Sequence, residues 1–191
     1  MSKKRCAWCI GDPVYEAYHD NEWGYPIFND SLMFEFLTLE TFQAGLSWIT
    51  ILRKRRNFKI AFDNFDYHKI ASYDIQKKEQ LLDNPGIIRN RLKISASIIN
   101  AKAFIRIQDT NGSFANYIWN FVSGEPIINK FKHLTEVPEF TPLAEQISKD
   151  LKQKGFKFVG PRIIYAFMQA TGIVNDHLVD CFRHPKFNLK R

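Results

Sequence analysis

The sequence lacks the features that mark membrane and secreted proteins. It has no stretch of about 18 apolar residues, which a membrane-spanning helix needs, and the N-terminus MSKKR lacks the apolar segment of a secretory signal. We therefore expect a cytoplasmic protein with no membrane partner. With only 3 cysteines, a disulfide framework is not expected in that compartment, and metal binding or chance explains them better.

Acidic residues are in the minority, with 20 Asp and Glu against 27 Lys and Arg, for a net charge of +7. A positive charge favours a polyanionic partner such as DNA without proving one. Aromatic residues make up 15% of the chain, and such side chains fill cores or stack on bases. A hydrophobic content of 45% is ample for a core, and we treat residues 1–191 as a single unit.

Alternating strand patterns are nearly absent, so the sequence predicts an all-α protein. One apolar helical face, over residues 90–107, is formed by Ile94, Ile98, Ala101 and Ile105. Other helices are predicted at residues 14–21, within 57–83, and at 113–122, 143–154, 162–171 and 176–181, with a loop at 123–141 and a loose tail at 186–191. The predicted N-caps are Asp30 with Ser31, Asp66 and Asp74.

The stretch from Leu32 to Leu52 is the most apolar part of the chain, with apolar residues on every side of the helix it would form. A helix that is apolar all round is buried. Its carboxylate Glu40 must therefore be paired, hydrogen-bonded or beside a cavity. Gly45 predicts a break before Trp48. These residues leave two interpretations open: a structural ion pair in the core, or an acidic group at a binding cavity.

Cysteine and histidine residues gather near both ends of the chain, as Cys6, Cys9 and His19 and as His177, Cys181 and His184. On a helix, His177 and Cys181 would share one face, which suits two ligands of a tetrahedral zinc. Spacing alone favours Cys6 and Cys9 as the other two. Four protein ligands leave no open position, so such a zinc would be structural. Buried free cysteines and hydrogen-bonded histidines are the alternative.

Two glycine-containing turns precede predicted helices, at residues 84–89 and 155–160. Backbone N–H groups at the start of a helix can hold a phosphate, and phosphate contacts position a protein on DNA without reading its sequence. The basic residues beside the turns are Arg89, Arg91 and Lys93 in one case and Lys154, Lys157 and Arg162 in the other. An ordinary connection between helices is the alternative.

Six segments together resemble the 3-methyladenine DNA glycosylase I family: YHDNEWG (18–24), LETFQAGLSWITIL (39–52), GIIRNRLKI (86–94), GFKFVGP (155–161), YAFMQATG (165–172) and VNDH (174–177). They span nearly the whole chain in order, so the match is far more specific than one short motif. The resemblance implies a helix-hairpin-helix DNA glycosylase fold with a zinc joining the N- and C-terminal segments. It also implies a monofunctional enzyme that flips 3-methyladenine out of alkylated double-stranded DNA and hydrolyses its N-glycosidic bond.

The resemblance further implies roles for single residues. Glu40 would be the catalytic residue in the base pocket, and the aromatic walls would be Trp8, Tyr15, Tyr18 and Trp48. The wedge that fills the gap left by the flipped nucleotide would be Gly45 and Leu46. The hairpin residues on the DNA backbone would be Lys157, Gly160 and Arg162, although a small hydroxyl residue is expected where this chain has Arg162.

The zinc ligands that the resemblance implies are Cys6, His19, His177 and Cys181. Here His19 takes the place that spacing gives to Cys9, and Cys9 and His184 become non-ligands. Asp176 lies near the place where many helix-hairpin-helix glycosylases have an aspartate, but beside a zinc ligand it is expected to orient the site or cap a helix. We expect a monomer. The competing functions are a non-catalytic DNA-binding module joined by zinc and an enzyme for a different alkylated base.

Overall fold

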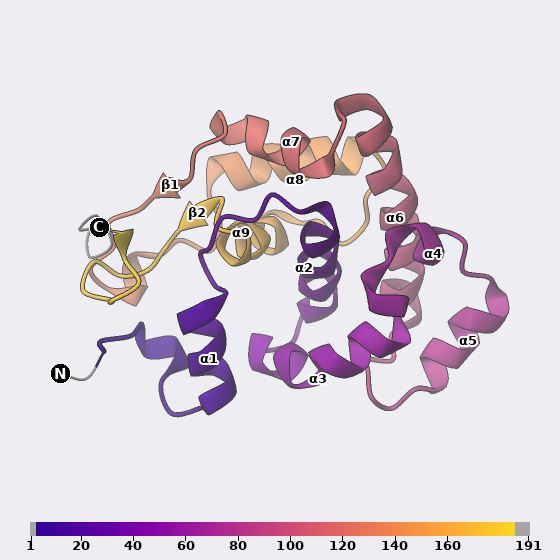
Figure 1. Cartoon of the computed structure of the whole chain (residues 1–191), viewed down its shortest axis with the longest axis horizontal. Coiled ribbons are helices and arrows are strands. Elements are labelled where there is room, and N and C mark those ends of the chain that lie inside the picture. The colour runs from indigo at the N-terminus through magenta and orange to yellow at the C-terminus, as the bar shows by residue number, and fades with distance from the viewer. Residues whose placement is uncertain (1–2, 186–191) are drawn as a thin grey trace.

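The computed structural model describes residues 3–185, which are mostly helical (Figure 1). The α-helices are α1 (Pro13–Asn21), α2 (Asp30–Gln43), α3 (Trp48–Ala61), α4 (Tyr67–Ala71), α5 (Ile75–Asp83), α6 (Arg91–Asn111), α7 (Phe114–Trp119), α8 (Pro142–Gln153) and α9 (Pro161–Ala170). Two strands, β1 (Ile127–Ile128) and β2 (Val174–Asn175), pair in parallel. The predicted helical class is confirmed, and no described helix is long and apolar enough to cross a membrane. The tail predicted at 186–191 lies outside the described residues.

Helix α2 lies at the centre of the molecule (Figure 1), and α9, α3, α6 and α7 pack against it. Every residue from Met33 to Phe42 is buried, as its apolar sequence predicts. The helix ends at Gln43, and Gly45 follows with φ of +81°. Glycine adopts this conformation at little cost, so the predicted break is confirmed. The turn at residues 43–47 then leads into α3, which begins at Trp48.

The N-cap of α2 differs from the prediction by one residue. Asn29 caps the helix by accepting a hydrogen bond from Leu32 N at 3.0 Å. The carboxylate of Asp30 instead accepts hydrogen bonds from the backbone N–H groups of Phe114 and Ala115 at 2.9 and 2.8 Å. These groups lie at the start of α7 and have no partner within that helix. Asp30 therefore ties two helices together, which local sequence cannot show.

Other predicted boundaries agree with the structure. Asp66 and Asp74 cap α4 and α5. Helix α6 ends before Gly112, which has φ of +78°. Three residues of its predicted apolar face, Ile94, Ile98 and Ala101, are buried, and the fourth is half-buried.

The helix predicted at 176–181 is wrong. Strand β2 pairs with β1, which lies within the predicted loop at 123–141. After β2 the chain stays non-helical: the Asn175 side chain accepts a hydrogen bond from His177 N at 3.2 Å, and Val179 N donates to Phe131 O at 2.9 Å. A helix this short is marginal in isolation, so bonds to distant residues decide its conformation.

The segments near the two ends of the chain lie on the same side of the molecule, at the left of Figure 1. Phe182 N donates to Lys4 O at 2.8 Å, and the Lys4 ammonium pairs with the Asp180 carboxylate at 2.5 Å. These contacts bring the two groups of cysteine and histidine residues together.

Candidate functional site

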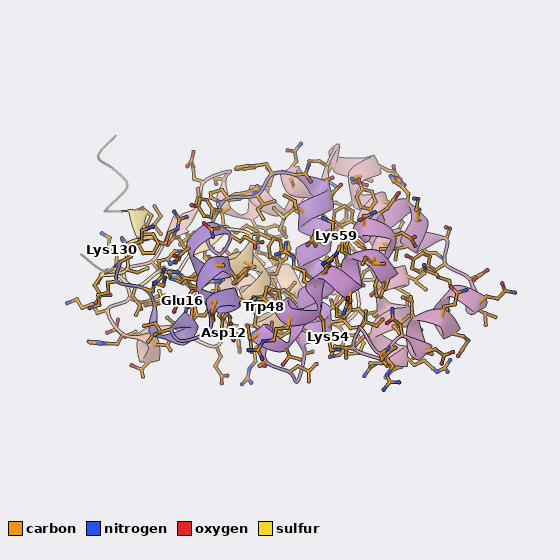
Figure 2. The ribbon with its side chains drawn as sticks, turned by 60° about the horizontal axis from the view of Figure 1, so that its bottom comes forward. Asp12, Glu16, Trp48, Lys54, Lys59 and Lys130 are labelled. Carbon is orange, nitrogen blue, oxygen red and sulfur yellow. The ribbon has the colours of Figure 1, made fainter. Side chains whose placement is uncertain are left out.

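A cavity of about 220 Å³ lies between α1, α2 and the segment after β2. It is lined by every residue predicted for the base pocket, namely Trp8, Tyr15, Tyr18, Glu40 and Trp48. Figure 2 shows Trp48 between Asp12 and Glu16 on the α1 side and Lys54 and Lys59 on α3. Residues from both ends of the chain, from Cys6 to Leu178, line this one cavity.

Glu40 is the acidic group of α2 that faces this cavity. It is 2% exposed, and its Oε2 atom has no hydrogen-bond partner. Burial raises the pKa of Glu40 well above its ordinary value. The guanidinium of Arg55 pairs with Glu35 at 2.7 Å and Glu22 at 2.5 Å, not with Glu40. The structure therefore gives Glu40 no ion pair with a described residue, and of the two interpretations it favours the carboxyl group beside a cavity.

Aromatic rings form the walls of the cavity. The Trp8 ring meets that of Tyr15 edge-on at 4.8 Å between centroids, and the ring of Tyr18 lies 5.5 Å from that of Trp48. The buried Trp48 Nε1 has no hydrogen-bond partner. A fifth aromatic residue, Trp23, also lines the cavity and lies 5.0 Å from Trp8. Sequence reasoning missed Trp23, although it stands in the quoted segment YHDNEWG, four residues after His19.

Asp176 lies on the cavity wall and is 2% exposed. Its carboxylate accepts hydrogen bonds from the Tyr165 hydroxyl at 2.6 Å, Gln169 Nε2 at 2.8 Å and Asn129 Nδ2 at 2.7 Å. A carboxylate with three such donors is fixed in place. This arrangement fits the predicted orienting role, and it joins the strand-side loop to α9.

Four buried side chains form a group that could hold a metal ion: Cys6, His19, His177 and Cys181, whose ligand atoms all lie within 4.8 Å of one another. Cys181 Sγ lies 3.4 Å from His19 Nε2 and 3.6 Å from His177 Nδ1, and Cys6 Sγ lies 3.8 Å from His177 Nδ1. A hydrogen bond between the two thiols lowers the pKa of Cys181 and raises that of Cys6. Metal ligands must be deprotonated, so a cation bound here would displace protons from these thiols.

The ligand pair that spacing favoured, Cys6 with Cys9, does not form. A short 3-10 turn at Ala7–Cys9 directs the Cys9 thiol to the Cys6 carbonyl, to which it donates at 3.1 Å. His184 Nε2 lies 3.1 Å from Asn129 O. The four-residue set that the resemblance implied is the one that comes together, although His177 and Cys181 do so from a loop and not from a helix.

The group of Cys6, His19, His177 and Cys181 also supports the aromatic wall. The ring of His19 lies 5.4 Å from that of Trp8, and the ring of His177 lies 4.6 Å from that of Trp23. On its other side, His19 Nδ1 lies 2.9 Å from Asp20 Oδ1, and Asp20 accepts hydrogen bonds from Arg5. Partners of this kind fix the orientation and tautomer of a metal-binding imidazole.

The second glycine turn joins α8 to α9. The buried side chain of Asn100 holds it through both of its amide atoms: Nδ2 donates to Lys157 O at 3.0 Å, and Oδ1 accepts from Lys157 N at 2.8 Å. The Lys157 side chain is exposed, and Gly160 is the N-cap of α9. Arg162 forms an ion pair with Glu139, and both side chains are exposed. In this structure the Arg162 guanidinium is therefore paired with a carboxylate, whereas the prediction placed it on a DNA phosphate.

The polar groups of the first glycine turn, at residues 84–89, have partners within the protein. Gly86 N donates to Asn84 Oδ1 at 2.8 Å, and Lys54 Nζ donates to Pro85 O at 3.0 Å. Lys93, predicted to accompany this turn at a phosphate, is instead buried. The structure therefore favours an ordinary connection between helices at this turn.

Comparison with known proteins agrees with this geometry. The family model for methyladenine glycosylase matches residues 8–184. The chain is 46% identical to DNA-3-methyladenine glycosylase 1 of Escherichia coli (strain K12) over 95% of this chain and 97% of that protein.

Solved structures give the same result. The crystal structure of a 3-methyladenine DNA glycosylase I superposes with a TM-score of 0.93 at 49% identity, covering 95% of this chain and 100% of that one. A tyrosine-to-phenylalanine variant of a 3-methyladenine DNA glycosylase I in complex with 3-methyladenine gives a TM-score of 0.92 at 38% identity, covering 95% and 97%. The chain therefore belongs to the methyladenine glycosylase family.

Proposed function

We propose that this chain is a monofunctional DNA glycosylase that removes 3-methyladenine from alkylated double-stranded DNA. The observation that carries the proposal is the buried Glu40 carboxyl group, which has an unpartnered oxygen at the wall of an aromatic cavity. Family membership supports the same activity. The enzyme acts in base excision repair, as a monomer and as a single glycosylase unit.

The chemistry of the substrate suits such a cavity. A base inside a duplex cannot be reached, so the enzyme flips the nucleotide out, which costs less for a damaged base. 3-Methyladenine is cationic while it is attached to the sugar, and it leaves as a neutral molecule. Its glycosidic bond is therefore weak, and catalysis needs no strong general acid. Water then completes the hydrolysis at the sugar carbon.

The aromatic walls and Glu40 would select this base. A cation over an aromatic ring gains about 0.5–2 kcal/mol, and stacking on an aromatic side chain is worth about 1–3 kcal/mol per base. When it is ionised, the Glu40 carboxylate would accept hydrogen bonds from the amino group of adenine and balance the positive charge of the attached base. Because guanine presents a different hydrogen-bonding pattern, guanine lesions would bind poorly. Trp48 Nε1, the other unpartnered polar atom of this wall, is available to a ring nitrogen.

Leu46 would fill the gap that the flipped nucleotide leaves in the duplex. It is 40% exposed and lies on the turn directly after α2, six residues beyond Glu40. The hairpin between α8 and α9 would hold the DNA backbone through Gly160 and Lys157, with Arg162 contributing when it leaves Glu139. In this interpretation α8, the turn and α9 are the helix-hairpin-helix element.

The metal would be one structural Zn²⁺ held by Cys6, His19, His177 and Cys181. In a tetrahedral zinc site, sulfur and nitrogen ligands lie about 3.5 Å apart, and the observed sulfur-to-nitrogen distances of 3.4, 3.6 and 3.8 Å fit this value. When bound, the ion joins the two ends of the chain. All four positions would be taken by protein atoms, so the protein residues around the cavity carry the reaction.

The direct test is incubation of the purified protein with methylated duplex DNA, followed by identification of the released bases. We expect free 3-methyladenine without strand cleavage. Binding to DNA without release of any base would instead identify a DNA-binding module, and release of a different alkylated base would change the substrate.

A further inference from the structure

Lys93 is buried in the first turn of α6, with 6% of its surface exposed. Its ammonium group donates hydrogen bonds to Phe42 O at 2.8 Å and to Ala44 O at 2.5 Å. Both carbonyls belong to the end of α2 and the turn that follows it. Lys93 makes no ion pair with any carboxylate in the described part of the chain, and burial lowers its pKa.

The position of this cation cannot be explained by its own helix. The N-terminus of a helix carries a partial positive charge, so a lysine there is unfavourable, whereas the C-terminus of a helix favours a cation. Lys93 is the third residue of α6, and its ammonium group meets the C-terminal carbonyls of α2. Lys93 therefore stabilises the C-terminal end of α2.

The turn at residues 43–47 has little other support. Gly45, Leu46 and Ser47 are exposed, and a Cβ atom added at Gly45 would meet nothing within 4 Å. Among residues 3–185, Lys93 is the only side chain from another helix that hydrogen-bonds to residues 42–46. Within the turn itself, Leu46 N donates to Gln43 O at 2.6 Å, so Lys93 supplies the hydrogen bonds that tie the described turn to another helix.

We propose that Lys93 is a positioning residue that fixes the Leu46 turn relative to the Glu40 pocket, so that the wedge enters the duplex as the base enters the cavity. The inference rests on the proposed wedge function of Leu46. Phe42 and Ala44 lie between Glu40 and Leu46 in the chain, so the two hydrogen bonds set the geometry that links pocket and wedge. Without them the pocket stays intact, but insertion into the duplex becomes slower.

The test compares Lys93→Met with Lys102→Met, the same change at an exposed lysine of α6. For each variant, the rate of 3-methyladenine release from duplex DNA is measured under single-turnover conditions, together with the affinity for free 3-methyladenine. We expect Lys93→Met to release the base about ten-fold more slowly, which corresponds to about 1.4 kcal/mol, with unchanged affinity for the free base. Lys102→Met should match the wild-type protein in both measurements.

A parallel loss of free-base affinity in Lys93→Met would show a general structural role and overturn the inference, as would wild-type release from duplex DNA. If Lys93→Met does not fold, Lys93→Arg gives the same comparison, because it keeps the charge but displaces the carbonyls.

The variant Leu46→Ala separates this inference from the proposed function. If Leu46→Ala alone leaves duplex release unchanged, the wedge itself is wrong. If it slows release, Lys93→Met should add little in the double variant, because both changes act on the same step. A full additional loss in the double variant would overturn the role of Lys93 and leave the wedge standing.

Discussion

The buried Glu40 side chain lowers the stability of the folded protein. Its proposed role in binding the base explains why a carboxyl group stands there. Its pKa is raised well above the ordinary value by burial, and no described side chain donates to its Oε2 atom. A buried carboxyl group without a partner destabilises the folded state. Sites prepared for a ligand commonly trade stability for activity in this way. The sequence alone raised the question, because Glu40 interrupts an apolar helix, but it could not show whether an arginine or a cavity lies beside it.

We predict that Glu40→Gln stabilises the ligand-free protein, and that the gain grows as the pH rises. Below its ordinary pKa, Glu40 is protonated in both the folded and the unfolded chain. As the pH rises above that value, only the unfolded chain ionises, so the wild-type protein loses stability until the raised folded-state pKa is reached. Glutamine has no such loss. Urea unfolding at pH 5 and pH 8 measures the difference, and an equal gain at both values would contradict the prediction.

At the scale of the helices, the sequence predicts well those elements whose boundaries and burial depend on their own residues. The buried α2, the caps Asp66 and Asp74 and the end of α6 at Gly112 all follow from local patterns. The error at 176–181 and the role of Asp30 arise where a distant partner decides: β1 and Phe131 for the first, and the start of α7 for the second. The hairpin between α8 and α9 belongs to the second kind, because Asn100 of α6 holds it.

We predict that Asn100→Ala loosens this hairpin and lowers affinity for undamaged duplex DNA without changing affinity for free 3-methyladenine. The variant leaves Lys157 N and O without their partner, and a buried unsatisfied group costs about 1–3 kcal/mol. Urea unfolding and a DNA titration at fixed salt measure the two effects.

A suitable control is Asn111→Ala, at the exposed far end of the same helix. If Asn100→Ala lowers stability but leaves DNA affinity unchanged, the hairpin does not contact DNA.

At the scale of the whole molecule, the cysteine and histidine group holds the chain ends against the aromatic wall. Sequence spacing identified the two clusters and suggested a metal, but it favoured Cys9, because the turn that directs Cys9 away is not visible as a pattern. The resemblance supplied His19. The structure adds that His19 packs against Trp8 and His177 against Trp23. We therefore expect loss of the proposed zinc ion to displace the aromatic wall of the pocket.

We predict that Cys6→Ser loses bound zinc, whereas Cys9→Ser, the matched change three residues away, retains one equivalent. Elemental analysis of the purified variants measures this. Removal of the metal from the wild-type protein with a chelator should lower both the free energy of unfolding and the affinity for 3-methyladenine. Loss of zinc from Cys9→Ser with retention in Cys6→Ser would reverse the ligand assignment.

The central claim is that the cavity beside Glu40 holds a single 3-methyladenine base. Calorimetric titration of the free base into the wild-type protein and into Glu40→Gln tests it most directly. We predict binding of one equivalent to the wild-type protein, no comparable binding of guanine, and an affinity for 3-methyladenine at least about ten-fold weaker in Glu40→Gln. Glutamine replaces one of the two carboxyl oxygens by an NH2 donor, and a buried polar group left without its partner costs about 1–3 kcal/mol. Absence of binding to the wild-type protein, or equal affinity in the variant, would contradict the account.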